Sequence, residues 1–424
     1  MQTISTNLLQ AVRFFCSLLV CLFLFGCGAD QQQEIAVQDL DLNLPDANGQ
    51  ETIDPVFDSE IRELIAGYLQ QIEVDYLQLE SAIDILLADV TIFLEQPDSN
   101  TLEQLRESWL FAHSAYELTA LHRYFANHIL AEQDALELSQ LLYQINHWPI
   151  LAGYIDYVDA YPESGIVQDV NVLLTEDSLR SQHGSFDLSE ATLGFHVLEF
   201  LIWGSNSDQG SARLASDYLE STELSSIQIS NGFELDQLTD NRRRQLLLLV
   251  TQTLRKDFQQ VRTLWIDRTS SLQQRVERSQ NVSSQQLLIL TIDAMTSMLT
   301  EELLVRSLYP MLNGEFNESI QSPFSHSTQN AVSSQLIGFE RLLLESQSES
   351  GMTFDILLSS ASEDFSEFFY QNFDASKECL VRLYSTMDSD SGAVEVSEFE
   401  IVECINLVTN MIDNLEQIRR GFSN

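Results

Sequence analysis

The chain has 424 residues and a formal net charge of −43, from 64 acidic and 21 basic residues. A surface this acidic repels nucleic acid and anionic lipid and suits cations or cationic partners, so we expect no nucleic-acid partner. A protein adapted to a salt-rich medium would carry the same excess without binding anything, and this second explanation stays open. A mature chain of roughly 400 residues favours two domains.

The first 26 residues predict a signal peptide. Arg13 is followed by an uncharged apolar run, 14–25, which has the length of a signal-peptide core and is too short to span a bilayer. The run Leu24–Cys27 resembles the lipobox of bacterial lipoproteins, which implies cleavage before Cys27 and attachment of lipid to its thiol. An ordinary secretory signal that ends in Gly-Cys is the alternative. Gly28 favours the outer membrane, so we expect a membrane-anchored protein that faces the periplasm or the cell surface.

Apolar residues recur at intervals of three, four and seven along most of the remaining chain, which predicts amphipathic helices. Sustained strand alternation and glycine-rich phosphate loops are missing from the sequence, so we expect an all-α fold of two helical bundles joined at a loop-rich waist. After an acidic flexible tether at 27–57, we place an N-terminal bundle at 58–220 and a C-terminal bundle at 221–424. The expected helices lie at about 61–93, 101–131, 133–146, 189–203, 239–265, 283–308, 329–346, 353–386 and 394–420.

Two cysteines remain once the signal peptide is removed and Cys27 is committed to lipid. The midpoint between Cys379 and Cys404 in the sequence falls on a turn-like run, 388–392. If long helices flank this turn as an antiparallel hairpin, the two thiols face each other, and an oxidising compartment favours their pairing. We therefore predict a disulfide between them. Two free buried cysteines are the alternative.

The short helix expected at 189–203 is apolar almost all round, which predicts burial, yet it carries His196 and Glu199. Positions three apart lie on one face of a helix, so the imidazole and the carboxylate point the same way. Burying an ionised carboxylate is unfavourable unless it is paired, hydrogen-bonded or bound to a metal. His196 and Glu199 can share one metal ion. A His–Glu hydrogen bond at a helix junction explains the pair equally well.

Several motifs, taken together, resemble a known family. The run Gly194–Glu199, followed by Trp203 and Gly204, looks like the GxHxxE motif of the imelysin-like family, also catalogued as peptidase family M75. That family is related to periplasmic iron-uptake lipoproteins. Further similarities lie at Trp109, Tyr116, Thr119 and Arg123, at 146–149, at 154–157, and at 322–328.

This resemblance implies two helical bundles with the motif helix at their junction. It implies His196 and Glu199 as metal ligands, and a pocket lined by Tyr116, Thr119, Arg123, Asp156, Ser325, His326 and Thr328. The chain also departs from the family. His113 stands where an arginine is usual, 152–153 replaces an acidic pair, and 326–327 replaces Asp-Asn. The charge of the pocket is therefore changed, so that either its ligand differs or the site is degenerate.

Other polar residues are weaker candidates. His113, His122 and His128 share an expected helix, but their spacings of nine and six residues do not bring all three to one face, so we expect ordinary surface or interface residues. Glu302 and Arg306 have the spacing of an i, i+4 ion pair.

Three functions from different classes follow. In the first, the protein binds a metal ion, with iron favoured over zinc, or a metal chelate at His196 and Glu199, and passes it to metal-uptake proteins. In the second it is a metallopeptidase, although a zinc peptidase normally shows two histidines on one helix and a third ligand. In the third, it is a surface interaction module with a degenerate site. The sequence does not decide whether the protein is an enzyme.

Overall fold

The computed structural model describes residues 55–423 except 206–211, 279–281, 349 and 389–395, and its described part contains helices and connecting loops without β-strands. The all-α prediction is confirmed. The predicted signal peptide, the lipid-bearing Cys27 and nearly all of the tether at 27–57 lie outside the described residues, as does most of the turn at 388–392. Among the described residues, no helix combines the length and the apolarity needed to cross a membrane.

A first group of helices packs around one long helix, α2 (Pro55–Glu95). The apolar positions that predict this helix are its buried ones, from Ile61 to Phe93. Asp98 then begins α3 with a capping box, in which its carboxylate accepts hydrogen bonds from the backbone of Asn100 and Thr101. The group comprises α2, α3 (Ser99–Leu118), α4 (Ala120–Ile129), α5 (Glu132–Asn146), α10 (Thr239–Val261) and α11 (Asp267–Glu277).

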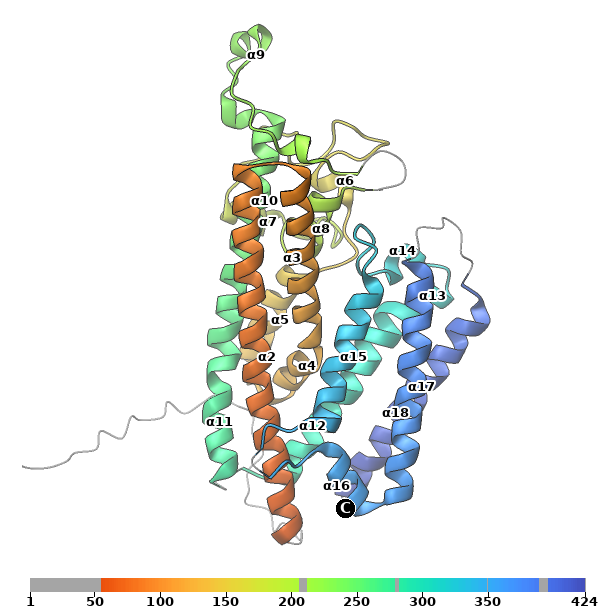
Figure 1. The fold of residues 1–424 in the computed structure, drawn as a ribbon. Coiled ribbons are helices and arrows are strands. Elements are labelled where there is room, and N and C mark those ends of the chain that lie inside the picture. The colour runs from red at the N-terminus through yellow and green to blue at the C-terminus, as the bar shows by residue number, and fades with distance from the viewer. Residues whose placement is uncertain (1–54, 206–211, 279–281, 349, 389–395, 424) are drawn as a thin grey trace, which may run out of the picture. The chain divides into compact units, whose positions relative to one another are not determined.

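A second group contains the later helices and packs against the first through α12 on α4 and α15 on α3 (Figure 1). Its members are α12 (Ser284–Met298), α13 (Tyr309–Leu312), α14 (Phe316–Ser319), α15 (Thr328–Leu344), α16 (Phe354–Ala361), α17 (Glu363–Met387) and α18 (Glu398–Ser423). A disulfide between Cys379 and Cys404, the pair expected from the sequence, joins α17 to α18. Helices α10 and α11 lie beyond residue 220 yet pack in the first group, so packing does not follow the predicted boundary. The division into domains itself stays a prediction.

Six short helices and two π-helical segments complete the elements of the described chain. The short ones are α6 (Ala152–Ile155), α7 (Glu176–Gln182), α8 (Phe195–Trp203), η1 (Ala215–Tyr218), α9 (Ser226–Ser230) and η2 (Leu235–Gln237). The π-helical segments η3 (Arg262–Ile266) and η4 (Leu299–Leu308) continue α10 and α12. Such segments are uncommon and occur often at functional sites. Segment η4 carries Glu302 and Arg306.

The helix predicted at 101–131 is broken at Thr119, between α3 and α4. The carbonyl of Tyr116 explains the break, because it accepts hydrogen bonds from the Thr119 hydroxyl (2.7 Å) and from Arg123 Nη1 (2.6 Å). These side chains replace the regular backbone ladder with local bonds. Three of the residues that we expected to line a pocket thus sit together at one helix break.

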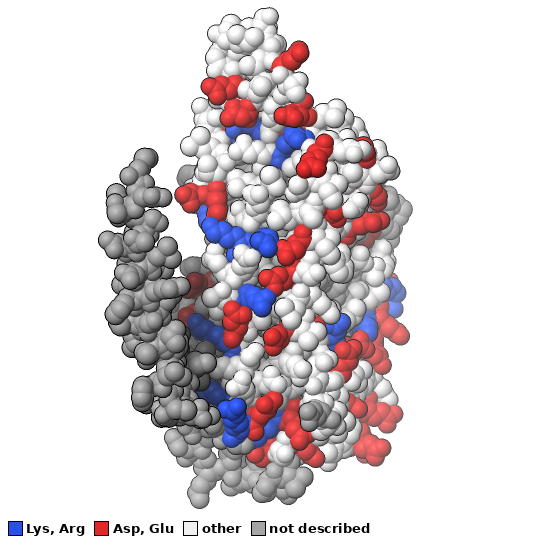
Figure 2. Space-filling model, turned by 60° about the vertical axis from the view of Figure 1, so that its left-hand side comes forward, with Lys and Arg blue, Asp and Glu red and all other residues white. Residues whose placement is uncertain are grey.

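Basic side chains on the surface lie beside acidic ones, as Figure 2 shows for one face. Arg255 pairs with Asp84, and Lys256 Nζ lies 2.7 Å from Glu176. These pairs are exposed and contribute little stability each. Because acidic residues outnumber basic ones about threefold, at most about a third of the carboxylates can pair one to one with Lys or Arg.

Candidate functional site

Helix α8 is the apolar helix that the sequence predicts to be buried. Eight of its nine residues are buried, and it packs against α3, α5, α6 and α10. Trp109 of α3 fixes its first turn, because the indole Nε1–H donates a hydrogen bond of 3.0 Å to the carbonyl of Phe195. Gly194 and Gly204 flank the helix, both with positive φ. The motif glycines therefore set where α8 begins and ends.

Gly194 allows the start of α8 to touch the end of α5. A Cβ at this position would lie 2.5 Å from the carbonyl oxygens of Gln144 and Ile145, closer than two such atoms approach. The end of α5, which leads into Asn146 and His147, is consequently held beside the start of α8. The first glycine of the motif is thus explained by packing.

The two motif side chains are bonded to each other. His196 Nδ1 lies 2.9 Å from Glu199 Oε2, and the two side chains are 1% and 0% exposed. When Glu199 is ionised it accepts the Nδ1 proton, which leaves Nε2 of His196 as the nitrogen with a lone pair. Nε2 has no hydrogen-bond partner among the described residues. This nitrogen is therefore the atom of the pair that can take a further ligand.

The serine-rich loop before α15 holds the other oxygen of Glu199. Oε1 accepts hydrogen bonds from the backbone of Phe324 (3.0 Å), from the backbone of Ser325 (2.8 Å) and from the Ser325 hydroxyl (2.7 Å). The Ser322 backbone donates to the Thr328 hydroxyl at 3.2 Å and closes the loop. Both carboxylate oxygens are thus engaged. Glu199 is therefore placed to orient His196, and its role as a metal ligand stays a prediction.

Burial shifts the proton equilibria of both side chains. It raises the pKa of Glu199 to about 7, although the hydrogen bonds from Ser325 work against this rise. Burial, together with the nearby His113, holds the pKa of His196 well below its ordinary value. His196 is accordingly neutral at physiological pH, the form in which imidazole binds metals.

The raised pKa of Glu199 predicts a pH dependence of stability that Glu199→Gln should remove. Because the folded-state pKa of about 7 exceeds the ordinary 4.5, the stabilisation is present below pH 4.5 and is lost as the pH rises through 7. The free energy of unfolding of wild type minus that of Glu199→Gln should fall by on the order of 3 kcal/mol between these limits. Urea unfolding of both proteins at pH 4.5, 6, 7 and 8 measures it, and a difference that stays constant with pH contradicts the prediction.

His113 lies on the other side of His196. The two rings meet edge to face with centroids 5.1 Å apart, and His113 stacks on Trp109 at 4.7 Å. His113 is 2% exposed, so it lies at a helix interface and not at the surface. Its Nε2 is 3.5 Å from Glu117 Oε1, which is too long for a good hydrogen bond. An imidazole therefore stands beside the pair where the family usually places an arginine.

Glu117 is a buried carboxylate with four polar partners. Oε1 accepts from Asn146 (2.7 Å) and Gln321 (2.6 Å), while Oε2 accepts from Gln335 (2.8 Å) and lies 3.4 Å from Arg123 Nη2. Burial by itself would raise the pKa of Glu117, and the neighbouring donors and cations outweigh it and hold the pKa below its ordinary value. The carboxylate links α3, α4, α5 and α15 around the site.

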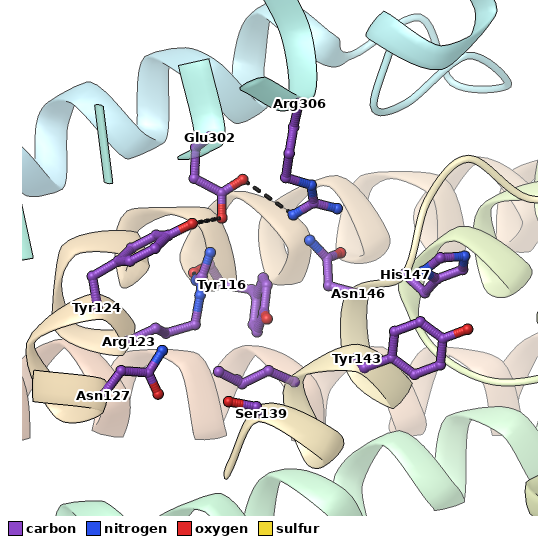
Figure 3. A pocket seen from close by; sticks show the side chains of 11 residues that line it. Tyr116, Arg123, Tyr124, Asn127, Ser139, Tyr143, Asn146, His147, Glu302 and Arg306 are labelled. Carbon is purple, nitrogen blue, oxygen red and sulfur yellow. Dashed lines mark hydrogen bonds and ion pairs between the residues drawn. The ribbon is translucent and has the colours of Figure 1, made fainter. Parts of the chain in front are cut away.

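A polar pocket of about 270 Å³ opens on this network, and we call it the Arg306 pocket. Figure 3 shows Glu302 and Arg306 of η4 facing side chains of α3, α4 and α5 across it. Glu302 accepts hydrogen bonds from Tyr124 (3.1 Å) and from Arg306 Nη1 (3.2 Å), the i, i+4 pair that the sequence predicts. Tyr116, Arg123, Asn146 and His147 are among the lining residues.

The remaining predicted residues lie in other surroundings. Asp156 is buried between two arginines, with Arg243 Nε at 2.5 Å and Arg213 Nη2 at 3.2 Å, and these pairs satisfy its charge. His326 is exposed, at a turn with φ 53°. Trp203 packs against Trp109 with ring centroids 5.3 Å apart. Among the described residues, no three His, Cys, Asp or Glu side chains are grouped closely enough to hold a metal ion.

Fold and site together define an all-α protein with a buried His–Glu pair where its two groups of helices meet. The model of the imelysin family, peptidase M75, matches residues 72–417, and the chain therefore belongs to this family, which confirms the prediction from its motifs.

Two solved structures are similar to the chain. One is a protein described as an iron-regulated protein A precursor from Parabacteroides distasonis, with 13% identity and a TM-score of 0.59 over 90% of this chain and 98% of that one. The other is an imelysin-like protein from Psychrobacter arcticum, with 14% identity and a TM-score of 0.50 over 84% of this chain and 93% of that one. At these identities the likeness shows the fold alone. No curated protein matches the chain.

Proposed function

We propose that this protein binds a metal ion, iron in preference to zinc, or a metal chelate at His196, as an exported lipoprotein that is anchored through Cys27 and serves metal uptake. The observation that carries the proposal is the buried Nε2 of His196, which has no hydrogen-bond partner in the described part of the chain and whose ring is oriented by Glu199. A carboxylate that accepts one imidazole proton and leaves the other nitrogen for the metal is a recurring arrangement in metal sites. Imidazole suits both iron and zinc.

One imidazole nitrogen is too few ligands for a bare ion. Glu199 has both oxygens hydrogen-bonded, Asp156 is paired with two arginines, and His326 is exposed whereas His196 is buried. We therefore propose that further ligands arrive with the metal. A chelate meets this need better than a free ion does. The name of the Parabacteroides distasonis relative, an iron-regulated precursor, supports iron and supports export, and the acidic surface suits a cationic cargo.

The family name makes a metallopeptidase the second candidate. A catalytic zinc site needs three protein ligands and a water. The described residues offer no group of three, and the carboxylate on α8 is bonded to His196 and to the loop at 324–325. Binding is therefore the function that this geometry supports better than hydrolysis.

Removing the imidazole tests the proposal. Protein purified from its own cell envelope should contain iron in stoichiometric amount by elemental analysis, and His196→Ala should lose it without a change in circular dichroism. Glu199→Gln should weaken iron binding by about 10–100-fold, the usual effect of losing an outer-shell partner. His128→Ala, on α4 and hydrogen-bonded to Ser297, is the control and should retain the metal.

Two outcomes would overturn this function. Full iron content in His196→Ala would show that the metal is held elsewhere. Chelator-sensitive cleavage of a peptide library by wild type, abolished in Glu199→Ala, would favour the peptidase instead.

A further inference from the structure

The Arg306 pocket has unused hydrogen-bond donors and no unused carboxylate. One carboxylate oxygen of Glu302 accepts a hydrogen bond from the Tyr124 hydroxyl, and the other accepts one from Arg306. Glu117, behind the wall, accepts hydrogen bonds on both oxygens. A guanidinium has five N–H donors, and the hydrogen bond to Glu302 uses one of those of Arg306. The pocket therefore favours an anion over a cation, although the chain as a whole carries a net charge of −43.

Arg306 is held in a fixed position from two sides. Its guanidinium carbon lies 4.6 Å from the centroid of the Trp148 ring, and Glu302 anchors Nη1. The side chain is 34% exposed, so its remaining donors can be reached from the pocket. A planar guanidinium presented in this way binds a carboxylate through two parallel hydrogen bonds.

The opposite wall holds two acceptors that lack a donor within the described ranges, Asn146 Oδ1 and His147 Nε2. Burial lowers the pKa of His147 to about 4, so the ring is neutral, and its proton lies on the nitrogen that donates to the Leu188 backbone. Asn146 is 7% exposed, and because its amide nitrogen donates to Glu117, its Oδ1 is fixed as an acceptor. Neither Asn146 Oδ1 nor His147 Nε2 has a hydrogen-bond partner among the described residues. Figure 3 shows both side chains on the wall that faces Arg306. A hydroxyl group on the ligand would supply the missing hydrogen bond, and a second carboxylate would not.

We propose that the Arg306 pocket binds a small hydroxycarboxylate, with its carboxylate on Arg306 and its hydroxyl donating to His147 Nε2. The rings of Tyr116, Tyr124 and Tyr143 line the space around its carbon skeleton. The inference deepens the proposed function and rests on it in one respect, because hydroxycarboxylates complex metal ions through their oxygens. The pocket would then hold the chelator, while His196, which does not line it, would take the metal.

Calorimetry on the metal-free full chain tests the pocket separately from the metal. Citrate should bind, tricarballylate, which lacks only the hydroxyl, should bind about 5–10-fold more weakly, and glycerol should not bind measurably. Arg306→Gln should weaken citrate binding by about 10–100-fold, because it removes a charged partner. Arg255→Gln is the matched control, since Arg255 pairs with Asp84 away from the pocket.

The variant His147→Phe distinguishes the contribution of the ligand's hydroxyl to binding from that of its carboxylates. It keeps a ring of similar size in the wall but removes the acceptor, so citrate and tricarballylate should bind this variant with similar affinity. Absence of citrate binding to wild type, or equal binding by Arg306→Gln, would overturn the proposal. If citrate fails while iron still depends on His196, only the pocket inference falls. If citrate binds while His196→Ala keeps its iron, only the function proposed above falls.

Discussion

Replacing Gly194 by alanine is expected to lower the free energy of unfolding by about 4 kcal/mol. Gly194 has φ 95° and ψ −175°, a conformation that is almost confined to glycine. The added Cβ would also meet the carbonyl oxygens of Gln144 and Ile145 at 2.5 Å, and these backbone atoms cannot rotate away as a side chain could. Urea unfolding followed by circular dichroism measures the loss.

Gly232→Ala is the control for a positive φ without a clash. Gly232 has φ 75°, and a Cβ there would meet nothing within 4 Å, so only the left-handed conformation is penalised, by about 1 kcal/mol. The excess loss in Gly194→Ala then reports the contact between α8 and the end of α5 together with the stricter backbone conformation of Gly194, whose ψ is −175°. Equal losses in the two variants would mean that this contact does not require glycine. In that case the position of the end of α5 beside α8 would need another explanation.

Helices with a regular apolar stripe could be predicted from the sequence because their burial is periodic. Helix α2 is the clearest case, since the stripe from Ile61 to Phe93 is the face that the other helices cover. The break at Thr119 could not be predicted, because threonine and arginine are tolerated inside helices and the break depends on where their side chains turn. The placement of α10 beside α2 is likewise a matter of long-range packing, which local periodicity does not contain.

The residues of the candidate site also differ in how far the sequence could predict them. His196 and Glu199 could be found because both lie on one short apolar helix, where buried polar residues stand out. The burial of His113 could have been predicted, because His113 lies four residues after Trp109 on the apolar stripe of α3. Glu117 carried no such signal, since its partners Gln321 and Gln335 come from segments about 200 residues away. The loop at 322–328 was recognised by family resemblance, and its bonds to Glu199 came from the structure.

Replacing Glu117 by leucine is expected to lower the free energy of unfolding by about 4 kcal/mol at neutral pH. The substitution leaves Arg123, which is 6% exposed, as a buried charge without its partner. It also leaves the amide donors of Asn146, Gln321 and Gln335 unpaired, each at a cost of about 1 kcal/mol or more. The folded-state pKa of Glu117 is held below its ordinary value of 4.5. The stabilisation from Glu117 is therefore present above pH 4.5 and is lost as the pH falls through the folded-state pKa.

The double variant Glu117→Leu/Arg123→Met identifies the cause of that loss. If the stranded guanidinium is responsible, removing it as well should restore about 2 kcal/mol, because an apolar pair replaces a broken ion pair. Asp84→Asn, which breaks the exposed pair with Arg255, should change stability by less than about 0.5 kcal/mol. A Glu117→Leu loss as small as this control would show that the carboxylate does not organise the site. A large loss without recovery in the double variant would assign the energy to the three amide donors, and hence to the contacts that hold α5 and α15 around His196.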